Sequence, residues 1–263
     1  MGGSEIVLLF SGGADSGLAA VRLLESHERV RLLTVRHGLE LLIARSARLA
    51  GRLQQRYGAD RVEHRIVANR ALFRTAAGGR LLRPVHLHYP GVLVLAERAA
   101  LHGAAAACCR ALGIRDVADG STVRQAAVAP PQRRESVEAF RAFHARFGAR
   151  YHCPIYEETS AAARLSEMGL LVPEDRYTPD GAQGVAGMVA LELLRLAHSK
   201  LRNRLHPVFL VESGLQGLGL LTRRYPPPAR RQQARLARER EYLAQALERV
   251  AAALGQGPGP IVK

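Results

Sequence analysis

The segment from Glu5 to Glu25, EIVLLFSGGADSGLAAVRLLE, joins an aliphatic run to an apolar helical run through two adjacent glycines. A short aliphatic run that ends at glycines is typical of a strand buried on both faces of a parallel sheet. Glycines allow backbone N–H groups to approach an oxyanion, and the dipole of the following helix favours negative charge at its N-terminus. The segment therefore predicts a strand, a turn and a helix that together bind an anion, with hydroxyl donors at Ser11 and Ser16.

Strand-like and helix-like runs alternate along the rest of the chain. Strands are expected at residues 5–10, 30–36, 61–68, 115–118 and 149–155. Helices are expected at residues 16–26, 39–57, 92–112, 136–147, 159–168, 187–204 and 229–254, with a loop after the third strand and Gly113 as a helix cap. This alternation predicts an α/β fold, an open parallel five-stranded sheet with right-handed crossovers and helices on both faces. We expect one domain over residues 1–185 and a basic, mainly helical extension over residues 186–263.

The formal net charge of the 263-residue chain is +15. Clustered cations gain affinity for phosphates by releasing counterions, so this charge favours a polyanionic partner. A chain rich in arginine and alanine is also what mutational bias in a GC-rich genome produces. No apolar run reaches the roughly 20 residues that a membrane span requires, and no basic leader precedes the first strand. We therefore expect a cytoplasmic protein without a membrane partner.

The turn of the opening segment contains an acidic residue, Asp15. A carboxylate in an anion site is costly unless a cation offsets its charge, so Asp15 predicts that Mg²⁺ binds together with phosphates. The turn lacks the lysine of a Walker A loop and the GxGxxG spacing of a dinucleotide site. The pattern therefore indicates a phosphate site of another class.

The sequence LLFSGGADSGLAA resembles the PP-loop motif, SGGxDS, of the N-type ATP pyrophosphatase superfamily. The resemblance implies the fold of the adenine nucleotide α-hydrolases (the HUP fold) and cleavage of ATP between its α- and β-phosphates. An acceptor oxygen would attack the α-phosphorus, pyrophosphate would leave from the loop, and a nitrogen or sulfur nucleophile would then displace AMP. The implied residues are Ser11, Gly12, Gly13, Asp15 and Ser16 at the pyrophosphate, with Val35, Arg36 and His37 beside adenine.

Two later segments extend the resemblance. CCRALGIRDVADGST resembles the helix–strand–glycine element of the superfamily, which implies that Asp119, Gly120 and Ser121 lie beside the nucleotide. YHCPIYEETSAAARLSEMGL resembles the closing strand and helix of the 7-cyano-7-deazaguanine synthases. The chain differs from that group because it lacks zinc-binding cysteines near the C-terminus, and because Arg124 and Gln125 stand where the group has an acid.

The cysteines bear on the second step, because insertion of sulfur usually needs a protein thiol and insertion of nitrogen does not. Three cysteines are too few for a disulfide framework, and their spacing fits no zinc site. Cys153, at the expected end of the fifth strand, is a candidate nucleophile or persulfide carrier if Arg150, His152 or a bound cation lowers its pKa. The alternative is a small buried hydrophobic residue. For Cys108 and Cys109, in an Ala-rich helix, core packing is expected, although one could face the active-site edge.

Charged residues that follow the fourth strand are candidates for contact with the substrate, since substrates of this fold dock there. The candidate substrate-binding residues are Asp119, Arg124, Arg133 and Arg134, and simple solvation explains the last two equally well. The segment HLHYP at residues 86–90 is either a phosphate or base contact or an ordinary polar loop. The Arg-rich helix at residues 229–254 is a candidate surface for the tRNA backbone or for a homodimer, and a solvated face is the alternative.

We interpret the chain as an enzyme that uses ATP and Mg²⁺ to adenylate a carbonyl or carboxyl oxygen of a nucleobase-like acceptor, with release of pyrophosphate. The expected second step replaces oxygen by sulfur on a tRNA base or a free purine, with a sulfur-donor protein as partner. One alternative is nitrogen insertion, with amide or nitrile formation as in the deazaguanine synthases. The other is a non-catalytic module that binds nucleotide or RNA.

Overall fold

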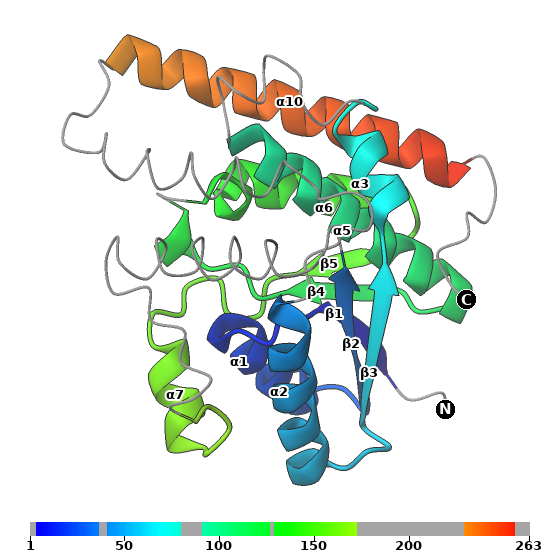
Figure 1. Cartoon of the computed structure of the whole chain (residues 1–263), viewed down its shortest axis with the longest axis vertical. Coiled ribbons are helices and arrows are strands. Elements are labelled where there is room, and N and C mark those ends of the chain that lie inside the picture. The colour runs from blue at the N-terminus through cyan, green and yellow to red at the C-terminus, as the bar shows by residue number, and fades with distance from the viewer. Residues whose placement is uncertain (1–3, 37–40, 80–90, 127–128, 173–228, 256–263) are drawn as a thin grey trace, which may run out of the picture.

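A computed structural model describes residues 4–36, 41–79, 91–126, 129–172 and 229–255 of the chain. Its strands are β1 (Glu5–Leu9), β2 (Arg29–Arg36), β3 (Val62–Ala68), β4 (Asp116–Asp119) and β5 (Arg150–His152). They form one parallel sheet in the order β3-β2-β1-β4-β5 (Figure 1). The predicted five-stranded parallel sheet is confirmed, although β5 is shorter than the strand expected at residues 149–155.

Helices cover both faces of this sheet, as the sequence predicts (Figure 1). One face carries α1 (Ala14–Leu24), α2 (Leu41–Tyr57) and α7 (Ala161–Glu167). The other face carries α3 (Arg70–Ala76), α5 (Gly91–Leu112) and α6 (Arg134–Ala145), and α10 (Ala229–Gly255) packs on these three helices as an outer layer. Two 3₁₀ turns, η1 (Val123–Gln125) and η2 (Pro130–Gln132), lie between β4 and α6.

The central strand β1 is buried on both faces, which explains its unbroken aliphatic run. Ile6 and Leu8 belong to the core shared with α1, α2 and α7, whereas Val7 and Leu9 belong to the core shared with α3, α5, α6 and α10. Successive strand side chains point to opposite faces, so an aliphatic residue is needed at every position. The chain moves from β1 to β2 and β3 on one side, then to β4 and β5 on the other. The strand order therefore reverses between β1 and β4, and ligands of open α/β sheets bind at such a switch point.

The helix α3 was not predicted, and the expectation of a loop after the third strand is wrong for residues 70–76. Tertiary contacts explain the helix. The buried side chain of Asn69 donates from Nδ2 to the carbonyl oxygen of Ala100 at 2.7 Å, which fixes the start of α3 against α5. Leu72 and Phe73 then enter the core shared with α5 and α10.

The end of α5 follows the prediction. Gly113 has a φ of +68°, the left-handed conformation typical of a helix C-terminus. The amide of Ile114 donates to the carbonyl of Cys109 at 2.9 Å, and this bond closes the last turn and directs the chain into β4.

The terminal helix α10 belongs to the core of the sheet domain. Leu243, Leu247 and Val250 are each at most 5% exposed and lie in the same apolar cluster as residues of β1 and α5. The expected domain boundary between residues 185 and 186, and the expected helix at residues 187–204, lie outside the described residues. Within the described ranges, the helices lack the combination of length and hydropathy that a membrane-spanning segment requires.

Two helical glycines give a matched test of how closely α10 packs on α5. A Cβ atom on Gly103 of α5 would overlap Cγ1 of Val250 and lie 3.3 Å from Cδ1 of Leu72, whereas a Cβ on Gly51 of α2 would meet nothing within 4 Å. We expect Gly103→Ala to lower the free energy of unfolding by about 1–2 kcal/mol, because overpacking outweighs the gain in helix propensity. Gly51→Ala should raise it by about 0.5–1 kcal/mol. Urea unfolding of both variants measures these shifts, and stabilisation by Gly103→Ala would contradict the packing of α10.

Candidate functional site

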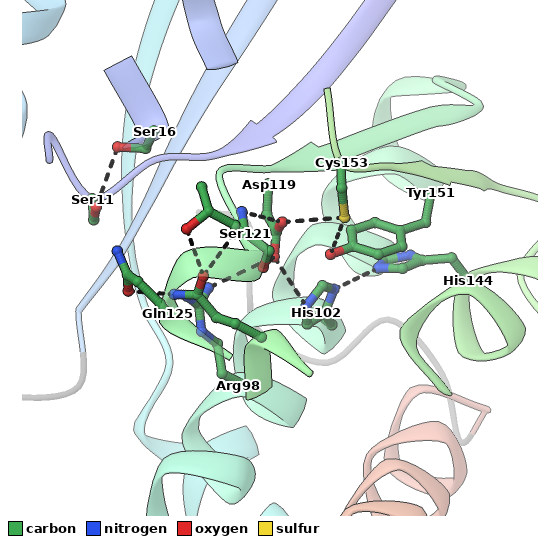
Figure 2. A network of polar contacts seen from close by, with 12 residues as sticks. Ser11, Ser16, Arg98, His102, Asp119, Ser121, Gln125, His144, Tyr151 and Cys153 are labelled. Carbon is green, nitrogen blue, oxygen red and sulfur yellow. Dashed lines mark hydrogen bonds and ion pairs between the residues drawn. The ribbon is translucent and has the colours of Figure 1, made fainter. Parts of the chain in front are cut away.

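The glycine turn after β1 forms a compact set of donors at the start of α1. The amide of Gly13 donates to the hydroxyl of Ser11 at 3.3 Å, and this hydroxyl lies 3.2 Å from that of Ser16 (Figure 2). The Ser16 hydroxyl also donates to the carbonyl of Gly13 at 3.1 Å. Gly13 is the N-cap of α1 and provides no side-chain cap. The first backbone amides of α1 therefore have no side-chain cap. Such amides at a helix N-terminus can bind an anion.

Gly12 is required at its position for two reasons. Its φ is +74°, a conformation that residues with a side chain rarely adopt. A Cβ atom at Gly12 would also lie 2.5 Å from Cα of Ser46, so the turn packs directly on the backbone of α2. The two adjacent glycines thus allow the turn to lie against α2 as well as to face an anion.

The end of β4 approaches the same turn from the other side of the switch point. A Cβ atom on Gly120 would lie 2.7 Å from the amide nitrogen of Ser16 and 2.9 Å from the carbonyl carbon of Asp15. Only a glycine fits this contact between two backbones. The structure therefore brings together the predicted residues of the first turn and those that follow the fourth strand.

Asp15 lies at the edge of this site and has polar partners. The side-chain amide of Gln125 donates to Oδ2 of Asp15, and Nη2 of Arg124 lies 3.9 Å from Oδ1. Burial raises the pKa of Asp15 above its ordinary value, while the positive charges of Arg124 and Arg45 act in the opposite direction. Of these, Arg124 was predicted near the substrate and here lies beside Asp15. Arg45 was not predicted, because its proximity depends on how α2 packs on the turn.

A chain of side-chain amides supports the contact with Asp15. Gln132 of η2 donates from Nε2 to Oε1 of Gln125 at 2.6 Å and accepts the backbone amide of Thr122 at 2.7 Å. Gln125, one of the two residues expected where the deazaguanine synthases have an acid, donates its side-chain amide to Asp15. Gln132 was missed by the sequence analysis, since an isolated glutamine between prolines and arginines carries no signal.

Asp119 at the end of β4 is 1% exposed, so it is buried beneath the site. Its carboxylate accepts the backbone amide and the hydroxyl of Ser121, both at 2.9 Å (Figure 2). Nη1 of Arg98 and Nε2 of His102 each lie 3.8 Å from Oδ2. Asp119 therefore fixes the conformation of residues 119–121, and its burial argues against the predicted direct contact with substrate.

His102 and His144 extend this network into the core. Nδ1 of His102 and Nε2 of His144 are 3.0 Å apart, and both side chains are fully buried. If His144 donates from Nε2, then His102 accepts at Nδ1 and directs its own Nε2–H towards the Asp119 carboxylate. In this arrangement the Nε2–H group of His102 points its positive end at the Asp119 carboxylate. Nδ1 of His144 is then an acceptor without a hydrogen-bond partner among the described residues. Burial lowers the pKa of His102 well below its ordinary value, so that histidine is neutral.

Cys153 follows β5 and lies in the same network. Its sulfur lies 3.2 Å from the hydroxyl of Tyr151 and 3.7 Å from Oδ1 of Asp119, and its single S–H can donate to only one of these two oxygens (Figure 2). Burial, with the negative charge of Asp119, raises the pKa of the Cys153 thiol to about 12. Arg150 and His152, which were expected to lower it, instead each contact Asp116 at 2.7 Å.

Arg150 and His152 therefore do not lower the pKa of the Cys153 thiol in this structure, and its side chain is half-buried. Cys108 and Cys109 are 6% and 2% exposed, which confirms their expected core packing. Burial raises the pKa of both thiols, that of Cys109 to about 12.

The remaining predicted residues do not gather at the turn as a group. Val35 and Arg36 end β2, where Val35 packs against the core, while His37 and the HLHYP segment lie outside the described residues. Arg133 forms an ion pair with the buried Glu239 of α10, and the exposed Arg134 lies 3.7 Å from Glu157. Arg133 is thus engaged with α10, which argues against its predicted contact with substrate.

Comparisons with known proteins add little to this geometry. No family model and no curated protein matches the chain. Among solved structures, the chain is similar to a predicted subunit of a tRNA methyltransferase from Methanocaldococcus jannaschii, at 18% identity. The match covers 66% of this chain and 92% of that chain, with a TM-score of 0.41. A match this weak carries no weight for function, so the site is interpreted from its own residues.

The buried histidines predict a loss of stability in acid. Burial holds the pKa of His144 at about 4, against 6.5 for an ordinary histidine. The unfolded chain then binds more protons than the folded chain between these two values, so the free energy of unfolding falls as the pH drops below 6.5. The contribution of His144 to this loss is about 2 kcal/mol between pH 7 and pH 5.

Urea unfolding at the two pH values tests this prediction. His144→Phe keeps an aromatic ring against Tyr151 but cannot bind a proton, so its loss of stability in acid should be smaller than that of the wild type by this amount. Equal losses for the variant and the wild type would contradict a buried neutral His144.

Proposed function

We propose that the chain binds ATP at the turn after β1 and adenylates an oxygen atom of an acceptor, with pyrophosphate as the leaving group. The main support is the contact between two backbones at the switch point, where Gly120 meets the amide of Ser16. It joins an anion-binding turn of the SGGxDS pattern to the residues after β4, in the place where open α/β sheets bind nucleotides. The similarity to the PP-loop superfamily supplies the class of reaction.

The donors of the turn suit a departing pyrophosphate. The hydroxyls of Ser11 and Ser16 lie 3.2 Å apart at the N-terminus of α1, where the first backbone amides of the helix have no side-chain cap. Donors fixed before the reaction stabilise charge that develops on a leaving group without reorganisation. We assign to Ser11, Gly12, Gly13 and Ser16 the binding of the two leaving phosphates.

Asp15 fits the role of a ligand for Mg²⁺. Mg²⁺ sites at nucleotides generally use one or two carboxylates together with phosphate oxygens, and Asp15 is the carboxylate of the turn. Within the described ranges, no group of three or more His, Cys, Asp or Glu residues gathers as a separate metal site. When bound, Mg²⁺ would neutralise charge on the phosphates. Gln125 would hold the carboxylate in place through its contact with Oδ2.

The second step uses a nucleophile from outside the chain in our proposal. The high pKa of the Cys153 thiol and the burial of Cys108 and Cys109 disfavour a persulfide carried by the protein. Sulfur insertion then requires a separate sulfur donor, and nitrogen insertion requires ammonia. The acceptor class we propose is a nucleobase-like carbonyl or carboxyl compound, either free or within tRNA.

The substitution Asp15→Asn tests the ATP site. The asparagine keeps an oxygen that can accept from Gln125, so we expect a folded protein. The rate of pyrophosphate release with Mg²⁺, ATP and candidate acceptors should fall by a factor on the order of 100 or more, because the neutral amide is a much weaker ligand for the Mg²⁺ that would offset the phosphate charge.

Asp60→Asn is a matched control for this variant. Asp60 is an exposed aspartate that precedes the N-terminal end of β3. The turn follows the C-terminal end of the parallel strand β1, so Asp60 lies at the other end of the strands. The Asp60→Asn variant should release pyrophosphate at the wild-type rate. Wild-type turnover by Asp15→Asn would refute the assignment of the site.

A second substitution separates protein-borne sulfur from external nucleophiles. Cys153→Ser keeps a hydroxyl that can donate to Asp119 or Tyr151, and it should turn over at close to the wild-type rate with ammonium or sulfide as nucleophile. Replacing Cys108 and Cys109 by alanine in addition should change stability more than turnover. Loss of turnover in a folded Cys153→Ser protein would show that the thiol takes part in the reaction.

A further inference from the structure

We propose that α10 positions the ATP site, and that Glu239 acts as a remote positioning residue for Asp15 through Arg133. The kinetic part of this inference rests on the proposed function. The structural part, that α10 fixes the loop over residues 121–126, does not depend on it.

Glu239 is a buried charge on an otherwise apolar helix face. It is 3% exposed, pairs with Arg133 through Oε2 and accepts Nε of Arg235 through Oε1 at 2.9 Å. A buried carboxylate is costly unless it is paired and hydrogen-bonded. The folded protein therefore needs the two arginines to offset the charge of Glu239. A small cavity of about 20 Å³ lies beside the pair, lined by residues of α5, α6 and α10.

Arg133 connects this charge to the loop after β4. While Nη1 of Arg133 pairs with Glu239, its Nε donates to the carbonyl oxygen of Ala126 at 3.3 Å. Ala126 directly follows Gln125, whose amide donates to Asp15. One guanidinium therefore joins α10 to the residue next to the partner of Asp15.

The residue before Arg133 makes a second connection to the same loop. Gln132 donates to Oε1 of Gln125 at 2.6 Å and accepts the amide of Thr122 at 2.7 Å. The side chain of Gln125 is thus held between Gln132 and Asp15, and the carbonyl of the next residue, Ala126, is held by Arg133. Gln132 is itself held by the hydroxyl of Tyr156 at 3.1 Å, so displacement of Arg133 would release the restraint at Ala126 first.

The same two helices provide an internal comparison. Glu248 of α10 pairs with Arg146, the C-cap of α6, but this pair is exposed and, among the described residues, makes no hydrogen bond to residues 121–126. Both pairs join α10 to an end of α6. The pair at the N-terminal end of α6 is the one that also contacts the loop, so it alone should affect Asp15.

The test replaces each pair and measures two quantities. Glu239→Gln leaves Arg133 without its buried counter-charge and is expected to destabilise the protein. The double variant Arg133→Met/Glu239→Leu removes both charges at similar volume, so it should recover stability. It still lacks the hydrogen bond to Ala126. Arg146→Gln/Glu248→Gln is the control, and the unfolding midpoint is recorded for all variants.

Hydrogen exchange of the amides of residues 121–126 is the first readout. We expect faster exchange in Arg133→Met/Glu239→Leu than in the wild type and the control, even where the unfolding midpoints agree. The second readout is pyrophosphate release. The double variant should lose about tenfold or more in kcat, with a smaller change in KM for ATP, because a misplaced Asp15 impairs the reaction more than nucleotide binding.

Unchanged exchange and unchanged kinetics in the double variant would overturn the inference. Recovery of kcat together with stability would also overturn it, since Glu239 would then be merely structural. If the wild type releases no pyrophosphate with any acceptor, the proposed function fails. In that case hydrogen exchange still decides whether α10 holds the loop.

Discussion

The contact between the end of β4 and the first turn of α1 is the constraint on which the site depends. Gly120 lies so close to the backbone of Ser16 that no side chain fits between them. This contact sets how closely the residues after β4 approach the N-terminus of α1, while β1 and β4 themselves are joined by their strand pairing. Ser11, Asp15 and Ser16 lie on one side of this contact and Gln125 on the other, so the contact determines how they lie relative to one another.

Beneath the junction, burial determines which groups carry charge. Asp119 is almost fully buried, and its carboxylate is satisfied by Ser121 with Arg98 and His102 nearby. The same burial keeps His102 neutral and the Cys153 thiol protonated. The interior below the turn is therefore a rigid support that orients residues 119–121. The reactive groups of our proposal lie above it, at the turn and at Asp15.

The sequence predicts what depends on local pattern and fails where distant contacts decide. The sheet, most helices and the turn could be predicted, because aliphatic strands, helical periodicity and adjacent glycines are local signals. Helix α3 could not, since Asn69 and Phe73 stabilise it through contacts with α5. The role of Arg133 could not either, because its partner Glu239 is more than a hundred residues away in the chain. The raised pKa of the Cys153 thiol depends on its burial and then on the charge of Asp119, which lies on a different strand.

A crystal structure with Mg²⁺ and a non-hydrolysable ATP analogue, methylene-bridged between the α- and β-phosphates, tests the central claim most directly. We predict that the β- and γ-phosphates contact the amides of the first turn of α1 and the hydroxyls of Ser11 and Ser16, with the α-phosphate towards Gly120. A nucleotide bound elsewhere on the molecule, or one whose phosphates point away from this turn, would contradict the account.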